Sequence, residues 1–277
     1  MTDTIITVII AARNEEKLIT DCLTALLAQD ESGPVEVIVA ANSCTDQTVP
    51  IAKAMTQSFA DKGWDLIVLD LADGGKLGAL NTADALAKGT NRVYLDADVI
   101  CDPALIGQLR TALAEPDARY ATGTLVVAPA RSWVTRAYAK IWTQLPFIKS
   151  SAVGAGLFAV NAAGRARWGK FPDIISDDTY VRLQFAPHER IEVPARYHWP
   201  MVEGLQNLIK VRRRQDIGVA EVNKLYPELT ANEGKARLQP QDIIRLFARA
   251  PIGFLVYLTV HIMVRMGRKS TDWTRGR

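Results

Sequence analysis

The chain has 277 residues, of which 48% are hydrophobic and 23% charged, and its formal net charge is +3. A chain of this length can bury a sizeable core, and the composition is that of a globular protein rather than a disordered or fibrous one. The small net charge argues against a nucleic-acid-binding protein, because nucleic-acid phosphates are bound by strongly basic surfaces.

The cysteines and the N-terminal residues bear on the compartment. Cys22, Cys44 and Cys101 are an odd number without CxxC spacing. This favours free thiols in a reducing compartment over a disulfide framework or a zinc site. The start, MTDTIITVIIAARNEE, lacks the basic residues and the long apolar core of a secretory signal peptide. We therefore expect a cytoplasmic protein.

In the first hundred residues, hydrophobic runs typical of strands alternate with patterns typical of helices. Short β-branched runs predict strands buried on both faces at Ile5–Ala11, Val35–Ala40, Leu66–Leu69 and Arg92–Leu95. Helical spacing of apolar residues predicts helices at Glu15–Leu27, Thr48–Ala60, Lys76–Lys88 and Pro103–Leu113. Asn14 is the expected N-cap of the first helix. This alternation over short connections predicts an α/β fold with a mainly parallel, helix-covered sheet.

After residue 121 the pattern is less regular. Strands are expected at Thr122–Ala128 and Gly154–Asn161, and helices at Asp178–Phe185 and Gln206–Lys224. The segment between the first two mixes aromatic and basic residues without a clear period. Because no internal repeat or linker interrupts it, the chain from residue 1 to 230 is expected to form one domain.

The last segment, residues 231–277, has a composition of its own. From Gln241 it is helical in pattern, and residues 250–264 carry no charge unless His261 is protonated. A helix of that length extends about 22 Å, less than the roughly 30 Å hydrocarbon layer of a bilayer. From Arg249 onward there are six Arg or Lys residues and one Asp. We therefore predict a helix that lies in the membrane interface without spanning it, with an ordinary buried C-terminal helix as the alternative.

Asp96 and Asp98 directly follow the fourth predicted strand. In extended chain, residues i and i+2 point to the same side, so both carboxylates would face the cleft at the carboxyl ends of the strands. Open α/β sheets bind their ligands in that cleft. Two hard oxygen ligands beside a diphosphate suit Mg²⁺ or Mn²⁺. An Asp-x-Asp triplet is common by chance, and its position after this strand is what favours a metal site.

Three segments, ITVIIAARNEEKLITDCLTALLAQ, VEVIVAANSCTDQT and GGKLGALNTADALAKGTNRVYLDADV, resemble in this order the family 2 glycosyltransferases, which have a GT-A fold. The resemblance is close over residues 5–115 and resumes at residues 156–185. It implies a Rossmann-like nucleotide-sugar-binding half at 1–115, an irregular acceptor half at 116–230, and then the C-terminal helical, membrane-associated segment. The implied activity is inverting, metal-dependent transfer of a sugar, of the hexosyltransferase type, from a nucleotide-sugar to an acceptor hydroxyl on a lipid or glycan.

The resemblance also implies donor-binding residues in the early loops. Ala11, Arg13 and Glu15 lie where a loop over the nucleotide base is expected. The family's Asp-Asp-Gly-Ser-Thr-Asp is here Ala-Asn-Ser-Cys-Thr-Asp, from residue 41 to 46. Asn42 keeps an amide for a base edge, but the loss of both carboxylates means that uridine is not predicted as the base. Asp46 is either a ligand or a helix-capping residue.

Lys76 follows two glycines at the start of the third predicted helix. A flexible loop, a cation and a helix N-terminus together suit a diphosphate. Arg214 lies where processive relatives carry Gln-x-x-Arg-Trp, but only the arginine of that motif is present here, which predicts single addition. The arginines at 212–214 would either clamp a diphosphate or form a solvated basic helix face.

The resemblance places the catalytic base at Asp178, with Asp177 beside it. The base would take the proton of the acceptor hydroxyl as that oxygen attacks the anomeric carbon. The metal would be held by Asp98, with Asp96 nearer the ribose, and would neutralise the leaving diphosphate. The alternative for the Asp177–Asp178 pair is a helix N-cap.

The sequence also bears on three other functions. A sugar nucleotidyltransferase would have a Gly-rich basic loop after the first strand, where this chain has Ala-Ala-Arg-Asn-Glu-Glu. A dinucleotide oxidoreductase would have GxGxxG after an early strand, and none is present. A catalytically weak family member acting as a membrane scaffold stays open because the donor-site aspartates are missing. The expected location is the cytoplasmic face of the inner or plasma membrane, as a peripheral protein.

Overall fold

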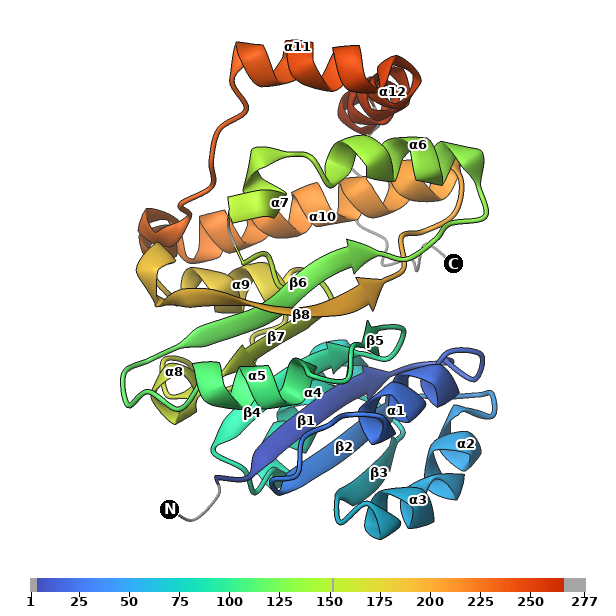
Figure 1. Ribbon diagram of the computed structural model, residues 1–277, viewed down its shortest axis with the longest axis vertical. Helices are drawn as coiled ribbons and strands as arrows, with labels where there is room; N and C mark the ends of the chain where they lie inside the picture. Colours follow the sequence, from blue (N-terminus) through green and yellow to red (C-terminus); the bar gives the residue numbers. More distant parts are fainter. Residues whose placement is uncertain (1–3, 151, 267–277) are drawn as a thin grey trace. The chain divides into compact units, whose positions relative to one another are not determined.

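The computed structural model describes residues 4–150 and 152–266 (Figure 1). The chain forms two compact units, each assembled from separated segments. Unit 1 comprises Met1–Val126, Gly154–Asp173 and Gln184–Trp199, and unit 2 comprises Val127–Val153, Ile174–Leu183 and Pro200–Arg277. The division expected from the sequence, residues 1–230 and 231–277, stays a prediction about which parts fold independently.

Unit 1 contains an eight-stranded sheet with the order β3-β2-β1-β4-β7-β6-β8-β5. The first four strands in that order are parallel, and β7 continues the sheet antiparallel to β4. This is the α/β sheet that the sequence predicts, extended by antiparallel pairs in its second half. The strands are β1 Ile6–Ala12, β2 Val35–Asn42, β3 Asp65–Leu71, β4 Asn91–Asp96, β5 Ile100–Cys101, β6 Tyr120–Val127, β7 Leu157–Val160 and β8 Arg190–Trp199.

The central strands are buried on both faces because helices cover both. Ile6, Val8 and Ile10 of β1 join one core cluster with side chains of α1, α3 and α5. Ile9 points to the opposite face, where α4 packs against β1 and β2. The helices of this unit are α1 Ile19–Leu27, α2 Thr48–Ala54, α3 Thr56–Asp61, α4 Gly75–Leu86, α5 Leu105–Ala112, α8 Ala162–Arg165 and η1 Pro187–Glu189.

The structure corrects two details of these helices. Asn14 is not the N-cap of α1, which begins at Ile19 after Leu18. Its backbone instead adopts a left-handed φ of 54°, and its side chain accepts a hydrogen bond from the Thr45 N–H. The single helix expected from Thr48 to Ala60 is divided into α2 and α3 at Met55.

Unit 2 is helical. Its members are α6 Trp133–Trp142, α7 Pro146–Ser150, α9 Asp177–Leu183, α10 Leu205–Leu225, η2 Pro227–Asn232, α11 Pro240–Arg249 and α12 Pro251–Met266. The sequence did not predict α6, which is capped by the Ser132 hydroxyl accepting from the Thr135 N–H. Helix α12 packs against α6 and α10 (Figure 1). A Cβ atom at Gly253 would lie 2.8 Å from the carbonyl oxygen of Ala137, so this glycine permits the close approach of α12 to α6.

None of the helices within the described ranges combines the length and the hydropathy needed to cross a bilayer. The alternative of a buried C-terminal helix holds for one side of α12, where Gly253, Val260 and Val264 are buried. The basic residues that the sequence places after Met266 lie outside the described residues.

A buried carboxylate connects three elements of unit 1. Asp84 of α4 accepts hydrogen bonds from Arg92 Nε at 3.0 Å, from the Tyr94 hydroxyl at 2.9 Å and from Arg165 Nε at 2.8 Å. Its side chain is 9% exposed. A buried charge is tolerated only when it is paired and hydrogen-bonded, and here one carboxylate balances two guanidinium groups. Asp84 therefore joins α4 to β4 and to α8, which follows β7.

We predict that Asp84→Ala lowers the free energy of unfolding by about 3 kcal/mol, because both arginines lose their buried counter-ion. Urea denaturation measures this change. The matched control is Asp65→Ala, which removes an exposed carboxylate 3.2 Å from Lys88 Nζ and should change stability by about 1 kcal/mol or less. Equal effects of the two substitutions would contradict the proposed role of Asp84.

Candidate functional site

The parallel register brings the carboxyl ends of β1, β2 and β4 to one edge of the sheet. Ala11 lies opposite Asp96 in the β1–β4 pair, and Ala12 lies opposite Ala41 in the β1–β2 pair. Asn42 is the last residue of β2. The structure thus brings together Ala11, Asn42 and Asp96, which the sequence analysis had assigned to one donor site.

The loops that leave β1 and β2 are joined by side-chain hydrogen bonds. Asp46 accepts from the Glu16 N–H at 3.2 Å and from the Thr48 N–H at 3.0 Å. The Thr48 hydroxyl in turn accepts from the N–H of Glu15 at 2.7 Å. Burial raises the pKa of Asp46, but the hydrogen bonds from Thr48 and Glu16 outweigh it and hold that pKa below its usual value. The Asp46 carboxylate therefore holds the loop of Arg13 and Glu15 against the start of α2.

Asn42 has a buried amide oxygen with no hydrogen-bond partner among the described residues, and the residue as a whole is 4% exposed. A buried acceptor without a donor is unfavourable, so a ligand N–H that reached it would be stabilised. The next residue, Ser43, has a left-handed φ of 48°, and its hydroxyl donates to the Ala72 carbonyl at 2.6 Å. Ser43 thus occupies a strained position where the family pattern has glycine.

Lys76 contacts the first carboxylate of the Asp-x-Asp triplet. Its ammonium group lies 3.2 Å from Asp96 Oδ1, and both side chains are partly exposed. Two glycines with positive φ, Gly74 at 119° and Gly75 at 62°, turn the chain into α4 and place the lysine in its first turn. The structure therefore joins the residue expected to bind the diphosphate to the residue expected beside the metal.

Asp98 lies in a turn after β4 and not in extended chain. Strand β4 ends at Asp96, whose N–H donates to the Gly156 carbonyl, and the chain then turns, with the Val99 N–H donating to the Asp96 carbonyl. The expectation of an extended Asp-Ala-Asp segment is wrong, because the ladder hydrogen bonds stop one residue into it. Alternation along a strand therefore does not determine where the Asp98 carboxylate points.

The acidic pair expected to hold the base belongs to unit 2, where it opens α9. Asp177 is buried, and Asp178 is partly exposed with Oδ1 accepting from the Thr179 N–H. The preceding residues are held by α10: the Ile175 N–H donates to Glu221 at 2.8 Å, and Gly218 leaves room for them. A Cβ atom added at Gly218 would lie 2.5 Å from the Ser176 hydroxyl.

The three arginines of α10 have different surroundings. Arg212 pairs with Asp216, and Arg213 donates to the Met263 carbonyl on α12. Arg214 has a buried Nε with no hydrogen-bond partner among the described residues. Arg212 and Arg213 are held by an acidic side chain and by α12, so Arg214 stays the predicted ligand for a diphosphate.

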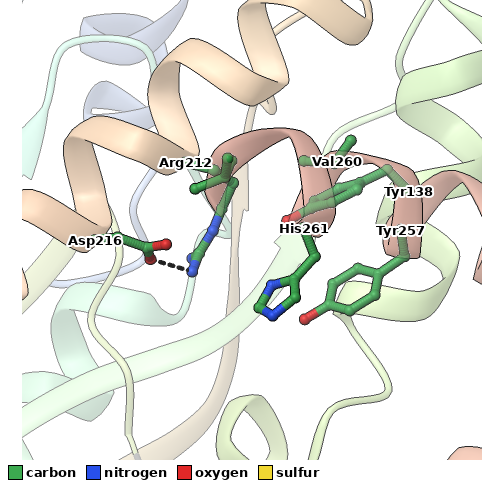
Figure 2. Close-up of a pocket in the computed structure, with 7 residues that line it drawn as sticks. Tyr138, Arg212, Asp216, Tyr257, Val260 and His261 are labelled. Carbon is green, nitrogen blue, oxygen red and sulfur yellow. Dashed lines mark hydrogen bonds and ion pairs between the residues drawn. The ribbon is translucent and has the colours of Figure 1, made fainter. Parts of the chain in front are cut away.

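A small pocket lies between α6, α10 and α12 in unit 2. Figure 2 shows the Arg212–Asp216 pair on one side and the His261 and Tyr257 rings on the other; the lining residues are Tyr138, Arg212, Asp216, Tyr257, Val260, His261 and Val264. Burial lowers the pKa of His261, and the charges of Arg265 and Arg212 lower it further. A neutral histidine and a paired arginine leave little charge, so this pocket is unsuited to an anion.

The family follows from comparison with known proteins. The family model described as Glycosyl transferase family 2 matches residues 7–166. The chain belongs to glycosyl transferase family 2. No match was found among curated proteins.

Solved structures resemble this family 2 chain over nearly its whole length. The mannosyltransferase PcManGT from Pyrobaculum calidifontis, in complex with GDP-Man and Mn²⁺, is 23% identical with a TM-score of 0.58, covering 95% of this chain and 76% of that chain. TarS 1–349 from S. aureus, in complex with UDP-GlcNAc, is 18% identical with a TM-score of 0.54, covering 95% and 92%. Glucosyl-3-phosphoglycerate synthase from Mycobacterium tuberculosis, with Mn²⁺, UDP and phosphoglyceric acid, is 16% identical with a TM-score of 0.53, covering 84% and 80%. These likenesses show the GT-A fold that the sequence predicts.

Two residues of this family 2 chain that no sequence motif indicates make contacts near the predicted site residues. Asn81 of α4 makes two hydrogen bonds with the backbone of Phe171, donating at 3.0 Å and accepting at 2.7 Å, and so holds that segment to α4. Gly218 of α10 leaves room for the side chains of Ile175 and Ser176, directly before the acidic pair. Both lie on helices at positions without a charged side chain, so no motif of chemistry-bearing residues indicated them.

We predict that Gly218→Ala lowers the rate of sugar transfer, because the added methyl group would press on the side chains of Ile175 and Ser176, the two residues directly before the acidic pair. Steady-state kinetics and thermal unfolding measure the two effects. The matched control is Gly107→Ala on α5, where a Cβ atom would come no closer than 3.4 Å to another residue. That change should leave transfer intact and raise the free energy of unfolding by about 0.5–1 kcal/mol. A Gly218→Ala protein as active and as stable as the control would contradict this role.

Proposed function

We propose that this family 2 member is an inverting, non-processive glycosyltransferase that moves a sugar from a nucleoside-diphosphate sugar to an acceptor hydroxyl. The main support for this proposal is that Asn42, Asp96 and Lys76 lie around the carboxyl ends of the central strands. Such an edge binds ligands in open α/β sheets, and these side chains offer an amide, a carboxylate and a cation to the base, ribose and phosphates.

Donor-binding residues are proposed in each unit. In unit 1, Asn42 offers its amide to the base edge, while Ala11, Arg13 and Glu15 lie in the loop that follows β1. The positive charge of Lys76, in the first turn of α4, favours a diphosphate at that helix end. Arg214 would supply a second cation from unit 2, and a guanidinium group can grip phosphate oxygens in a bidentate manner.

The Asp96 and Asp98 carboxylates suit a divalent cation, Mn²⁺ or Mg²⁺. The contact of Lys76 with Asp96 supports this assignment, because a positive charge is already stabilised there. No cluster of three or more His, Cys, Asp or Glu side chains arranged for a metal occurs within residues 4–150 and 152–266. Two carboxylates are enough for an ion that completes its coordination with substrate phosphates and water. When bound, the cation would supply positive charge beside the leaving diphosphate.

Asp178 would act as the general base, with buried Asp177 supporting it at the start of α9. The carboxylate takes the proton of the acceptor hydroxyl while that oxygen attacks the anomeric carbon on the face opposite the diphosphate. The bond from the anomeric carbon to the diphosphate oxygen breaks as the new glycosidic bond forms, which inverts the configuration. Lys76 and Arg214 stabilise the negative charge on the departing diphosphate.

The acceptor is proposed to be lipid-linked or a glycan, and the enzyme to work as a peripheral protein on the cytoplasmic face of the inner or plasma membrane. The amphipathic pattern of α11 and the apolar character of α12 support this location. A single addition is favoured over polymerisation, because only the arginine of the processive family motif is present at 211–215.

We predict that Asp98→Ala abolishes donor turnover and the tighter Mn²⁺ binding expected when nucleoside diphosphate is present. Turnover assays and calorimetric titration of Mn²⁺ measure the two effects. Asp70→Ala, which removes an exposed carboxylate from β3, is the control and should bind and react as the wild type does. Full activity of the Asp98→Ala protein in EDTA would contradict the metal assignment.

We predict that Asp178→Asn lowers the transfer rate by about 10²–10⁴-fold, the usual effect of losing a general base. Affinity for the nucleotide-sugar should stay close to that of the wild type, because Asp178 acts on the acceptor. Single-turnover kinetics and donor titration separate the two quantities. If Asp177→Asn abolishes transfer in a stable protein while Asp178→Asn does not, the base is the other carboxylate.

A further inference from the structure

Exposed apolar side chains gather on the last two helices. Nine of the thirteen exposed large hydrophobic residues in the described chain belong to α11 and α12. We call six of these side chains the apolar face: Ile243, Ile244 and Phe247 of α11, and Ile252, Leu255 and Ile262 of α12. Ile244 and Ile252 are 71% and 67% exposed. Solvent exposure on this scale is unfavourable for a continuous patch and marks an interaction surface.

The inward side of α12 is already occupied within unit 2. Val260 and Val264 are buried, and Arg213 of α10 donates to the Met263 carbonyl. The Tyr257 ring stacks on Tyr138 of α6 with 5.3 Å between centroids, beside the pocket seen in Figure 2. These contacts hold α12 in place, so its outward side cannot turn inward to complete the core.

Helix α11 is joined to α12 by an aromatic contact. The rings of Phe247 and Phe254 meet edge to face with 5.7 Å between centroids, and Leu246 is the buried residue of α11. The remaining apolar side chains of α11, among them Ile243 and Ile244, are exposed. The two helices therefore form one platform, fixed to unit 2 and apolar on the outside.

The charges around the apolar face select its partner. Arg245, Arg249 and Arg265 are exposed on the two helices, and Asp242 is the acidic residue among them. Asp242 accepts from the Gln239 N–H at the start of α11 and lies 3.7 Å from Arg245, so the net charge of the four groups is positive. A second copy placed face to face would bring arginines against arginines. An anionic lipid surface, in contrast, accepts aliphatic side chains and offers phosphates to the arginines at their edge.

We infer that α11 and the outward side of α12 form an interfacial anchor that binds an anionic bilayer, with Ile243, Ile244, Ile252, Leu255 and Ile262 entering the boundary between headgroups and acyl chains. No helix in the described part of the chain is suited to cross the bilayer, so both helices lie along its surface. The anchor deepens the proposed membrane location, on which it rests, by naming the side chains and the charge of the lipid.

The test is co-sedimentation of the full-length protein with two kinds of vesicle, phosphatidylcholine mixed with phosphatidylglycerol and phosphatidylcholine alone. The wild type should bind the anionic vesicles more tightly, and salt should weaken that binding. The double variant Ile244→Glu/Ile252→Glu should lose at least about tenfold in binding, because two carboxylates replace inserted side chains. Leu86→Glu, an exposed leucine on α4, is the control and should bind as the wild type does. Arg249→Gln should weaken binding about fivefold, to the anionic vesicles alone.

A second measurement tests insertion of the apolar face without changing the charge of the protein. In the Ile252→Trp protein, brominated lipid should quench fluorescence beyond the wild-type level, whereas Leu86→Trp should show no such increase. Unchanged binding by the double glutamate variant, or no vesicle binding by the wild type, overturns the anchor. A dimer in solution that the double variant converts to monomer, without vesicle binding, assigns the face to a second copy instead.

Transfer to a water-soluble acceptor without vesicles separates this inference from the proposed function. Transfer activity without vesicle binding would contradict the proposed anchor and support the proposed enzymatic function. Vesicle binding by a protein without transfer activity would contradict the proposed enzymatic function and support the anchor.

Discussion

The parallel register of β1 with its two neighbours is the constraint on which the donor side of this protein depends. Once Ala11 lies opposite Asp96 and Ala12 opposite Ala41, three chain segments must leave the sheet at the same edge. Burial on both faces holds that register, because a slip of one residue would exchange the side chains packed on the two faces and disrupt the packing of both. The loops can therefore vary in chemistry while their starting points stay fixed.

In unit 2 a single helix, α10, has a comparable role. Glu221 and Gly218 hold the segment before the acidic pair, and Arg213 holds α12. Arg214 is presented from the same helix. The proposed base, the proposed diphosphate ligand and the apolar platform thus share one rigid support, so a displacement of α10 would alter all three together.

Charge is used differently in the interior and at the edge of the sheet. Asp84 pairs with two arginines, and the loss of its carboxylate would leave both without their counter-ion. The Lys76–Asp96 pair is exposed enough for water to weaken it, so either side chain can exchange its partner at little cost in free energy. Strong pairs thus hold the framework, and a weak pair lies where a ligand must enter.

The sequence by itself determined the elements whose periodicity is strong and whose contacts are local. The strands from Ile6 to Asp96, the helices between them, and the clustering of Asn42 and Asp96 all follow from hydrophobic period and from the edge rule for parallel sheets. Helix α12 was also predictable as an apolar helix without the length to span a bilayer. The family motifs added expected roles for residues such as Lys76 and Asp178.

Tertiary structure decided what depends on partners distant in the chain. The local sequence predicts Asn14 as a helix cap, but its side chain bonds to the loop after β2. Asp98 lies outside the strand because the ladder of hydrogen bonds ends at Asp96. Strand β8 carries charged residues and a proline, and only its partners make it part of the sheet. Gly218 and Asn81 belong to no motif, and their importance arises from distant residues: the side chains of Ile175 and Ser176 pack at Gly218, and the backbone of Phe171 bonds to Asn81. Such contacts have no period along the chain, so only the folded structure identifies them.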